Sequence, residues 1–516
     1  MDTESHSVRR NAIPPNFWHA IPLIFIVFMV LFFPFRYRFE FNPDEGINAI
    51  KAMMNIKGYQ LYSEIWSDQP PIFTMLLTLC FRIFGLSIPA GRGLELLFSG
   101  AILWLGIQYL RQFWGNIHAI FGILTIMLLP YYLVLSVSIM IGLPAIAFAL
   151  LSFYTLSVWH KYGDVKWLIL SAFALGLSIM TKAFTAIVGP IFLSGIVISG
   201  WKDYRQHRDW LKACIPSAIW LTIFSLTVGS ILLIVVKSEN VFQLIQGHLL
   251  AGDSVLFRAY ADNRIGIYLS RFKYSIPMLI LAFLGGIAAL RSRSWTAMYL
   301  VAWVAIGSVS LFINVPFWHH QQLLVTIPAA ILAAIAVGEG LSRLQKTLQL
   351  RERNILVIAM GILVWAFAVT FMYFRLPSTV QLFDLKLPNL RAQPVEYSDD
   401  EEILALMLEY AHLTNWVYTD RPIFAFRSQL PVPPYLAVLS KKRIASGVLT
   451  EDQILEILEE YEPEQVFSGR LNLPVVQEYL STRNYDRVDS SAQYRLNVLE
   501  DFLQIPPSPA GSSNQE

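Results

Sequence analysis

Residues 71–85, PIFTMLLTLCFRIFG, decide the fold, because their place in the membrane fixes the side on which every later loop lies. The stretch has about 15 residues, or roughly 22 Å as a helix, and it carries Arg82. A membrane-spanning helix must cross a hydrocarbon core of about 30 Å. We therefore predict that residues 71–85 form a helix that lies along the membrane surface.

Long apolar runs fill most of the sequence around this stretch. Of the 516 residues, 55% are hydrophobic and 15% are charged, and about 20 apolar residues are enough to cross a bilayer. We predict an all-α polytopic membrane protein with about 11 transmembrane helices and two interfacial helices. The predicted spans lie near residues 17–36, 92–110, 116–135, 143–160, 166–180, 184–200, 212–236, 274–290, 295–313, 321–341 and 354–375.

Basic residues collect in alternate short loops between these runs. Such loops face the cytoplasm, and the short loops between them hold almost no Lys or Arg. If residues 71–85 crossed the membrane, the basic loops would face outward. The N-terminus, with Arg9 and Arg10 before an uncleaved first span, is then cytoplasmic. The basic loops carry Arg111, Lys161, Lys166, Lys202, Arg205, Arg208, Lys212, Arg291, Arg293, Arg343, Lys346, Arg351 and Arg353.

The composition changes after Arg375. Residues 376–516 contain no apolar run of span length, and an odd number of spans places them outside. We predict a transmembrane domain at residues 1–375 and a small extracytoplasmic α/β domain at residues 376–516. Strand patterns lie at residues 416–418 and 465–467, and helix patterns lie at residues 399–410 and 451–460.

Composition and missing motifs exclude several classes of protein. A net charge of +2 does not indicate nucleic-acid binding. Cys80 and Cys214 lie far apart in apolar segments, which predicts neither a disulfide framework nor a thiolate metal site. The sequence has no phosphate loop, no His-Glu-x-x-His motif and no Gly-x-Ser-x-Gly motif. It also lacks an Asp-x-Asp-type cytosolic domain for a nucleotide sugar.

The first external loop, residues 36–91, is the longest connection before the tail, and such a length is typical of a functional loop. It begins with FNPDEG at residues 41–46, followed by apolar residues at helical spacing as far as Gly58. Asp44 can cap a helix on the membrane surface, and Gly58 can end it. Two carboxylates would then be held at the bilayer surface. The alternative is that Asp44 is only a cap and Glu45 only a first-turn acid.

The second half of this loop, YSEIWSDQPP at residues 62–71, leads into the surface helix, with proline at its start. Two membrane-lying helices joined by polar and aromatic residues predict a substrate platform. We place Glu64, Asp68 and Gln69 on this platform.

These features resemble the GT-C superfamily of polyprenyl-phosphate-sugar glycosyltransferases. The resemblance rests on an Asp-Glu pair just after the first span, an amphipathic helix, and Pro-Pro entering a second helix. It is strongest to the branch with protein O-mannosyltransferases and lipid A aminoarabinose transferases, and it covers roughly residues 15–375. It implies that Asp44 is the catalytic base toward the acceptor hydroxyl and that Glu45 assists. A phosphate diester leaves readily, so the enzyme chiefly needs one base and cations.

Three outward segments contain candidate ligands for the carrier phosphate. Lys182 lies in Met-Thr-Lys-Ala, which is similar to the family's Thr-Lys-Gly loop, and a snorkelling lysine is the alternative. Arg258 and Arg264 lie in the loop of residues 237–273, where guanidinium groups suit phosphate oxygens, or form a solvated loop face. His319 and His320 precede the tenth span, where an aromatic-belt motif is the alternative.

Many relatives carry a second acidic residue after the third span, but residues 136–142 contain none here. Unless Glu64 or Asp68 substitutes for that second acid, metal dependence is not favoured, and no cofactor is predicted. The resemblance implies an inverting hexosyl or pentosyl transferase of cell-envelope glycan biosynthesis, in a bacterial plasma membrane with its active site outside. The donor would be a polyprenyl-phosphate-linked sugar and the acceptor a lipid, glycan or protein. Two alternatives are a transporter or flippase of lipid-linked sugar without catalysis, and a non-catalytic membrane assembly factor.

Overall fold

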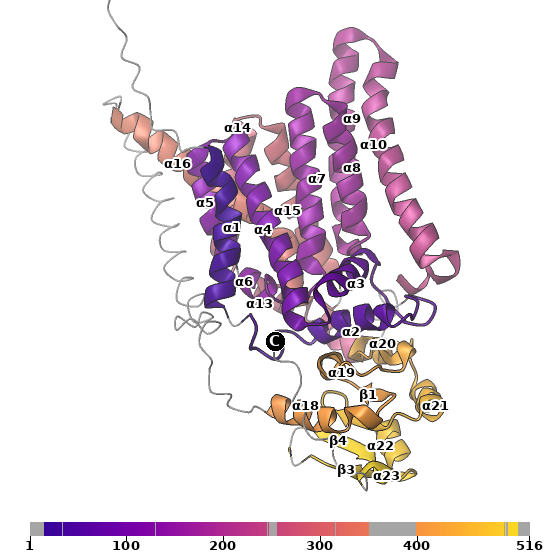
Figure 1. The fold of residues 1–516 in the computed structure, drawn as a ribbon. Coiled ribbons are helices and arrows are strands. Elements are labelled where there is room, and N and C mark those ends of the chain that lie inside the picture. The colour runs from indigo at the N-terminus through magenta and orange to yellow at the C-terminus, as the bar shows by residue number, and fades with distance from the viewer. Residues whose placement is uncertain are drawn as a thin grey trace, which may run out of the picture.

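The computed structural model describes residues 15–349, apart from residues 34, 130, 245, 247–254 and 315, and residues 399–503, apart from residues 490, 492 and 493. A long helical bundle carries a small mixed domain at one end (Figure 1). The prediction of a polytopic helical protein with a C-terminal α/β domain is therefore confirmed.

Helices occupy ten of the predicted spans, and the eleventh, residues 354–375, lies outside the described residues. Within the described part, six helices are long and apolar enough to cross a membrane, and α13 with α14, bent by 84°, would add a seventh. Helices α1, α5 and α8 are apolar but shorter. The bundle helices are α1 Pro15–Phe32, α4 Ile88–Phe113, α5 Asn116–Met127, α6 Tyr132–Leu135, α7 Gly142–Tyr162, α8 Val165–Ile179, α9 Val188–His207, α10 Trp210–Ile231, α14 Ile276–Arg291, α15 Trp295–Ile313 and α16 Leu323–Gln349.

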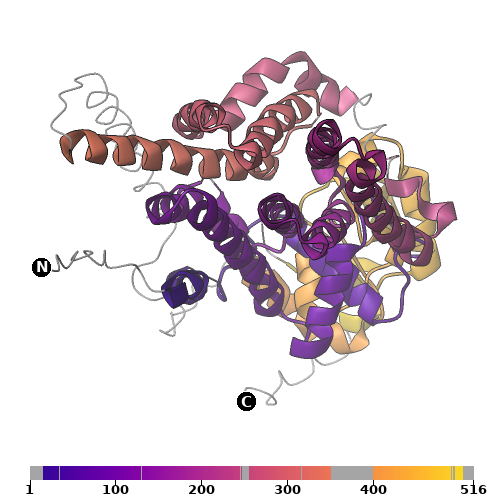
Figure 2. The ribbon, with the colours of Figure 1, turned by 90° about the horizontal axis from the view of Figure 1, so that it is seen from above.

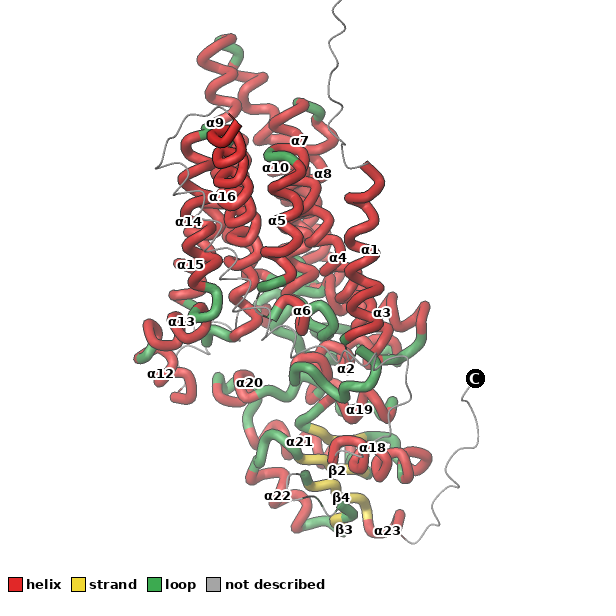
Figure 3. The backbone as a smooth tube through the Cα atoms, turned by 90° about the vertical axis from the view of Figure 1, so that its left-hand side faces the viewer, coloured by secondary structure: helices red, strands yellow, loops and turns green. Residues whose placement is uncertain are grey.

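The predicted interfacial helices are α2 Asp44–Ile56 and α3 Ile72–Phe84, and both lie between the bundle and the C-terminal domain (Figure 3). Helix α3 has 13 residues and is therefore about 20 Å long, too short to span. Its face with Met75, Leu79 and Ile83 is exposed, and the opposite face is buried. An apolar face left open on a short helix is what a helix lying in the membrane surface requires.

Short elements connect the bundle helices near the C-terminal domain. The described residues between α10 and α14 include short helices at the same end of the bundle as α2, as Figure 3 shows. These elements are η1 Ala183–Ile187, η2 Leu232–Val236, η3 Ser238–Asn240, α12 Val255–Asp262, α13 Arg264–Phe272 and η5 His319–Gln322.

The C-terminal domain is built on a four-stranded sheet in the order β1-β2-β4-β3. Strand β1 pairs parallel with β2, and the other pairs are antiparallel. The predicted strand and helix patterns correspond to β1, β2, α18 and α21. The elements are α18 Asp399–Glu409, η6 Ala411–Leu413, β1 Val417–Thr419, α19 Pro422–Ser428, η7 Pro434–Leu436, α20 Lys441–Ala445, α21 Glu451–Tyr461, β2 Gln465–Ser468, α22 Pro474–Ser481, β3 Tyr485–Arg487, β4 Arg495–Leu499 and α23 Glu500–Leu503.

The two ends of the bundle differ in charge as the loop pattern predicts. The short connections α4–α5, α7–α8, α9–α10 and α14–α15, which carry the basic residues, lie at the end away from the C-terminal domain (Figure 1). In the view along the bundle, the C-terminal domain lies beneath the purple and magenta helices (Figure 2). The basic loops therefore lie together at one end of the bundle, as their alternation along the sequence predicts.

One hydrophobic core joins the first external loop to the C-terminal domain. The rings of Phe39 and Phe424 lie 4.8 Å apart between their centroids, and those of Phe81 and Phe426 lie 5.1 Å apart. A Cβ atom at Gly46 would lie 2.4 Å from the backbone nitrogen of Ile423, so only glycine allows α2 and α19 this close. The C-terminal domain is therefore packed onto the segment that carries Asp44.

Candidate functional site

Asp44 opens helix α2. The N-cap position is Pro43, which makes no side-chain cap bond, and the Asn42 side chain instead accepts the Asp44 N–H at 3.0 Å. The expected capping role of Asp44 is therefore wrong, because Asn42 takes that place. Among the described residues, no hydrogen bond to the Asp44 carboxylate is found.

Glu45, the second member of the pair, is fully buried and already bonded. Its carboxylate accepts Arg92 Nε at 3.0 Å and Arg92 Nη2 at 3.0 Å, in a two-point ion pair with helix α4. It also accepts the backbone N–H groups of Phe41 at 2.7 Å and Ile139 at 3.1 Å. These contacts tie the Glu45 carboxylate to helix α4 and to two backbone N–H groups, and so hold the first turn of α2.

Residues 136–142 hold helix α2 from a second direction. This is the segment in which many of the resembling proteins carry a second acidic residue and this chain has none. The Asn48 side chain donates to the Ile139 carbonyl at 2.9 Å, while the Ile139 N–H binds Glu45. Within the described residues, no three His, Cys, Asp or Glu side chains come together in a way that could hold a metal ion.

Charged side chains converge on Asp44. Burial raises the pKa of the Asp44 carboxyl, whereas the positive charges of Lys182, Arg470 and Lys51 lower it. Asp68 also interacts with Asp44 and raises the same pKa further. We call these five residues, with Lys442, the charge cluster. A carboxylate with raised pKa beside several cations can stay ionised and still accept a proton.

Lys182 and Lys51 are the two lysines of the charge cluster that belong to the bundle and its first long loop. Burial lowers the pKa of each ammonium group to about 8, and the negative charges of Asp44 and Asp68 oppose that change. Lys182 is held beside the loop because the Ile72 N–H donates to the Met180 carbonyl at 3.1 Å, two residues before it. Both ammonium groups are therefore charged at neutral pH and buried next to the free carboxylate.

The C-terminal domain contributes the remaining two cations, which the sequence reasoning missed. Lys442 Nζ lies 3.0 Å from Asp68 Oδ2, and both side chains are largely shielded from solvent. Arg470 follows strand β2, and the Asp420 carboxylate accepts its backbone N–H at 2.8 Å. Nothing in the sequence near Lys442 or Arg470 indicates that they approach Asp44, some 400 residues away.

Of the three predicted platform residues, only Asp68 belongs to the charge cluster. Glu64 is exposed and accepts the backbone N–H of Gln60 at 2.7 Å, which closes a local turn. The Gln69 carbonyl accepts the Tyr62 hydroxyl at 2.8 Å and thereby holds the loop in shape.

The predicted phosphate ligands divide into two groups. His320 interacts electrostatically with Lys182 and so lies at the cluster. His319 turns the other way, onto the Arg271 guanidinium and the Tyr131 ring. Arg258 in α12 and Arg264 in α13 are exposed, and neither is among the main charges that shift the pKa of the Asp44 carboxyl. The structure thus brings together Lys182 and His320 and leaves the other three apart.

Fold and site together define a multi-pass membrane protein with a GT-C fold, as the loop motif predicts. Residues 68–232 match the family described as dolichyl-phosphate-mannose-protein mannosyltransferase. The structure of ArnT from Cupriavidus metallidurans bound to undecaprenyl phosphate is similar, with a TM-score of 0.59 at 13% identity, over 93% of this chain and 97% of that one.

A second solved protein is similar over most of this chain. It is the archaeal oligosaccharyltransferase AglB from Archaeoglobus fulgidus, in complex with an inhibitory peptide and a dolichol-phosphate. Its TM-score is 0.51 at 11% identity, over 88% of this chain and 69% of that one. No curated protein matches the sequence. At these identities, the structural likeness establishes the fold.

Proposed function

We propose that this protein is a glycosyltransferase that moves a sugar from a polyprenyl-phosphate carrier to a lipid, glycan or protein acceptor. The observation that carries the proposal is the unbonded Asp44 carboxylate beside the buried Lys182, in a fold shared with a protein solved with undecaprenyl phosphate. The matched family also has a name that specifies a lipid-phosphate sugar donor. The reaction takes place at the non-cytoplasmic face of a bacterial plasma membrane.

In the proposed reaction, Asp44 accepts the proton of the acceptor hydroxyl as its oxygen attacks the anomeric carbon of the sugar. The bond from that carbon to the phosphate oxygen breaks, and the electron pair leaves with the carrier as polyprenyl phosphate. Attack opposite to the leaving group inverts the anomeric centre. Lys182 and His320 receive the growing phosphate charge, which lowers the barrier most where water is excluded.

Rigid support of the base is part of this proposal. The Glu45–Arg92 pair and the Ile139 segment hold the first turn of α2, so the Asp44 carboxylate does not have to find its position during the reaction. The positive charges of Lys51 and Arg470 lower the proton affinity of the Asp44 carboxylate and so favour its ionised form. These residues are positioning and electrostatic residues rather than proton carriers.

The test compares the glycolipid and glycoprotein profiles of cells that carry the wild-type gene, Asp44→Asn, or the control Glu64→Gln. Glu64 is an exposed acid in the same loop, outside the charge cluster. We expect Asp44→Asn to lower product by about 100-fold or more, as for the loss of a general base, and Glu64→Gln to leave it unchanged. Equal products from wild type and Asp44→Asn would contradict the proposal and favour a transporter of lipid-linked sugar.

A further inference from the structure

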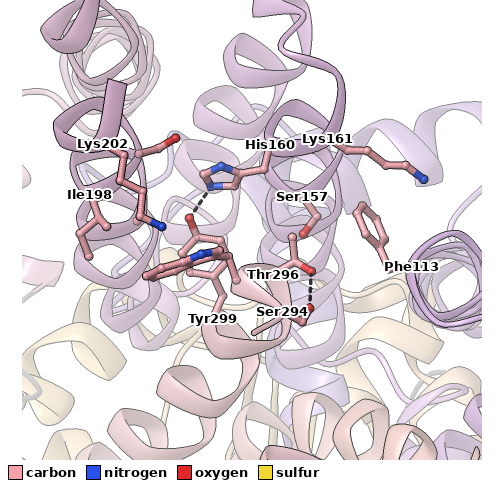
Figure 4. A pocket seen from close by; sticks show the side chains of 12 residues that line it. Phe113, Ser157, His160, Lys161, Ile198, Lys202, Ser294, Thr296 and Tyr299 are labelled. Carbon is pink, nitrogen blue, oxygen red and sulfur yellow. Dashed lines mark hydrogen bonds between the residues drawn. The ribbon is translucent and has the colours of Figure 1, made fainter. Parts of the chain in front are cut away.

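A polar pocket lies between the helices at the basic end of the bundle, opposite to the charge cluster (Figure 4). Its volume is about 340 Å³, and helices α4, α7, α9 and α15 contribute its walls. We call it the basic-end pocket. It is lined by Phe113, Ser157, His160, Lys161, Gly195, Ile198, Ser199, Lys202, Ser294, Trp295, Thr296 and Tyr299.

The lining of the basic-end pocket carries cations and hydroxyl groups but no carboxylate. Lys161 and Lys202 stand on opposite sides in Figure 4, with the hydroxyl groups of Ser157 and Thr296 between them. The Lys202 ammonium lies 3.6 Å from the centre of the Trp295 ring, and the Lys161 ammonium lies 5.3 Å from that of Phe113. Aromatic faces lie beside both charges without neutralising them, and the Lys161 ammonium also donates to the Gln112 carbonyl at 3.3 Å.

His160 and Tyr299 close one side of the pocket. The His160 ring nitrogen and the Tyr299 hydroxyl lie 2.5 Å apart, and Tyr299 is buried against Gly195. The Ser294 and Thr296 hydroxyl groups lie 3.4 Å apart at the start of α15 (Figure 4). Hydroxyl, imidazole and ammonium groups around one cavity are the donors that phosphate oxygens require.

The pocket also lies at the depth of the membrane boundary. Trp201, Trp210 and Trp295 are each about half exposed at this end of the bundle, and exposed tryptophans mark the level of the lipid headgroups. Basic pockets between transmembrane helices at such a level bind anionic lipid headgroups.

We propose that the basic-end pocket is a binding site for a phosphate group, supplied by the headgroup of an anionic phospholipid. Lys161 and Lys202 contact the phosphate oxygens from two sides, and the Ser294 and Thr296 hydroxyl groups at the start of α15 complete the site. The lipid tails lie against the apolar surface of the bundle. This site is separate from the charge cluster and does not depend on the glycosyl transfer proposed above.

The test measures phosphatidylglycerol binding to the purified full chain by native mass spectrometry, with phosphatidylcholine as the neutral comparison. The pocket variant is Lys161→Gln/Lys202→Gln, and the control is Lys166→Gln/Lys212→Gln. The control lysines lie at the same end, exposed and ion-paired with Asp164 and Asp209. Both pairs of substitutions remove the same charge, so general attraction to an anionic lipid falls equally in both.

We expect phosphatidylglycerol binding to weaken at least about tenfold in the pocket variant and less than about twofold in the control. Equal weakening in the two variants, or none in the pocket variant, overturns the proposal. Inorganic phosphate is titrated in parallel. Pocket-dependent binding of inorganic phosphate without pocket-dependent binding of phosphatidylglycerol also overturns the headgroup proposal, and it points to a soluble phosphate ester instead.

Discussion

Replacing Arg92 with methionine tests whether Glu45 positions the catalytic loop. The Glu45 carboxylate accepts hydrogen bonds from Phe41, Ile139 and two nitrogens of Arg92, and both charged side chains are fully buried. Arg92→Met leaves a buried carboxylate without its counter-charge. The free energy of unfolding should fall by about 3–5 kcal/mol, the usual cost of breaking a buried pair from one side. The control Arg82→Met removes an exposed arginine of α3 and should cost less than about 0.5 kcal/mol.

The double variant Glu45→Gln/Arg92→Met makes the test specific. It removes the unpaired charge while keeping a polar side chain of similar shape, so it should be more stable than Arg92→Met by at least about 2 kcal/mol. Apparent unfolding in mixed micelles, followed by tryptophan fluorescence, gives the comparison, and the glycan profile gives activity. The reasoning fails if the double variant is the less stable one. It also fails if Glu45→Gln abolishes product without lowering stability, because Glu45 would then act chemically.

Two further predictions concern the phosphate and the C-terminal domain. Because the pKa of Lys182 is lowered to about 8, its charge is present below that pH and lost above it. Binding of polyprenyl phosphate, measured by native mass spectrometry, should weaken as pH rises through about 8. Lys182→Arg should reduce that loss, and the part that remains is expected from Lys51, whose pKa is also lowered to about 8. An unchanged wild-type profile would contradict this. Gly46→Val should separate α2 from Ile423 and so expose the C-terminal domain to limited proteolysis. The control Gly93→Val should not, because Gly93 has open space around it. Equal cleavage in the two variants would refute that packing.

The sequence predicts the bundle well, because span length and loop charge are local properties of the chain. The surface position of residues 71–85 follows from a helix too short to cross, and strands β1 and β2 follow from short buried runs. In the sequence, Arg92 is an isolated arginine at the start of a predicted span. Its partner Glu45 lies 47 residues earlier. Such a pair becomes visible only when α2 and α4 are packed together.

The residues near Asp44 were harder to predict for a related reason. A guanidinium group suits phosphate oxygens in any loop, so Arg258 and Arg264 could be proposed from their residue type alone. The folded chain places Lys182 near Asp44, and the bond from Ile72 to Met180 ties its segment to the loop. Lys442 and Arg470 reach the charge cluster because the C-terminal domain packs against the bundle. No local sequence pattern predicts which residues such packing brings together.

The different tasks of Asp44 and Glu45 follow from helix geometry. Neighbouring residues of an α-helix point about 100° apart, whereas residues three or seven apart share a face. Glu45 therefore shares a face with Asn48, and both bind Ile139 in the bundle core. Asp44 shares a face with Lys51, and both belong to the charge cluster. An acidic pair at the start of this helix can thus supply one free carboxylate only because its other member fixes the helix.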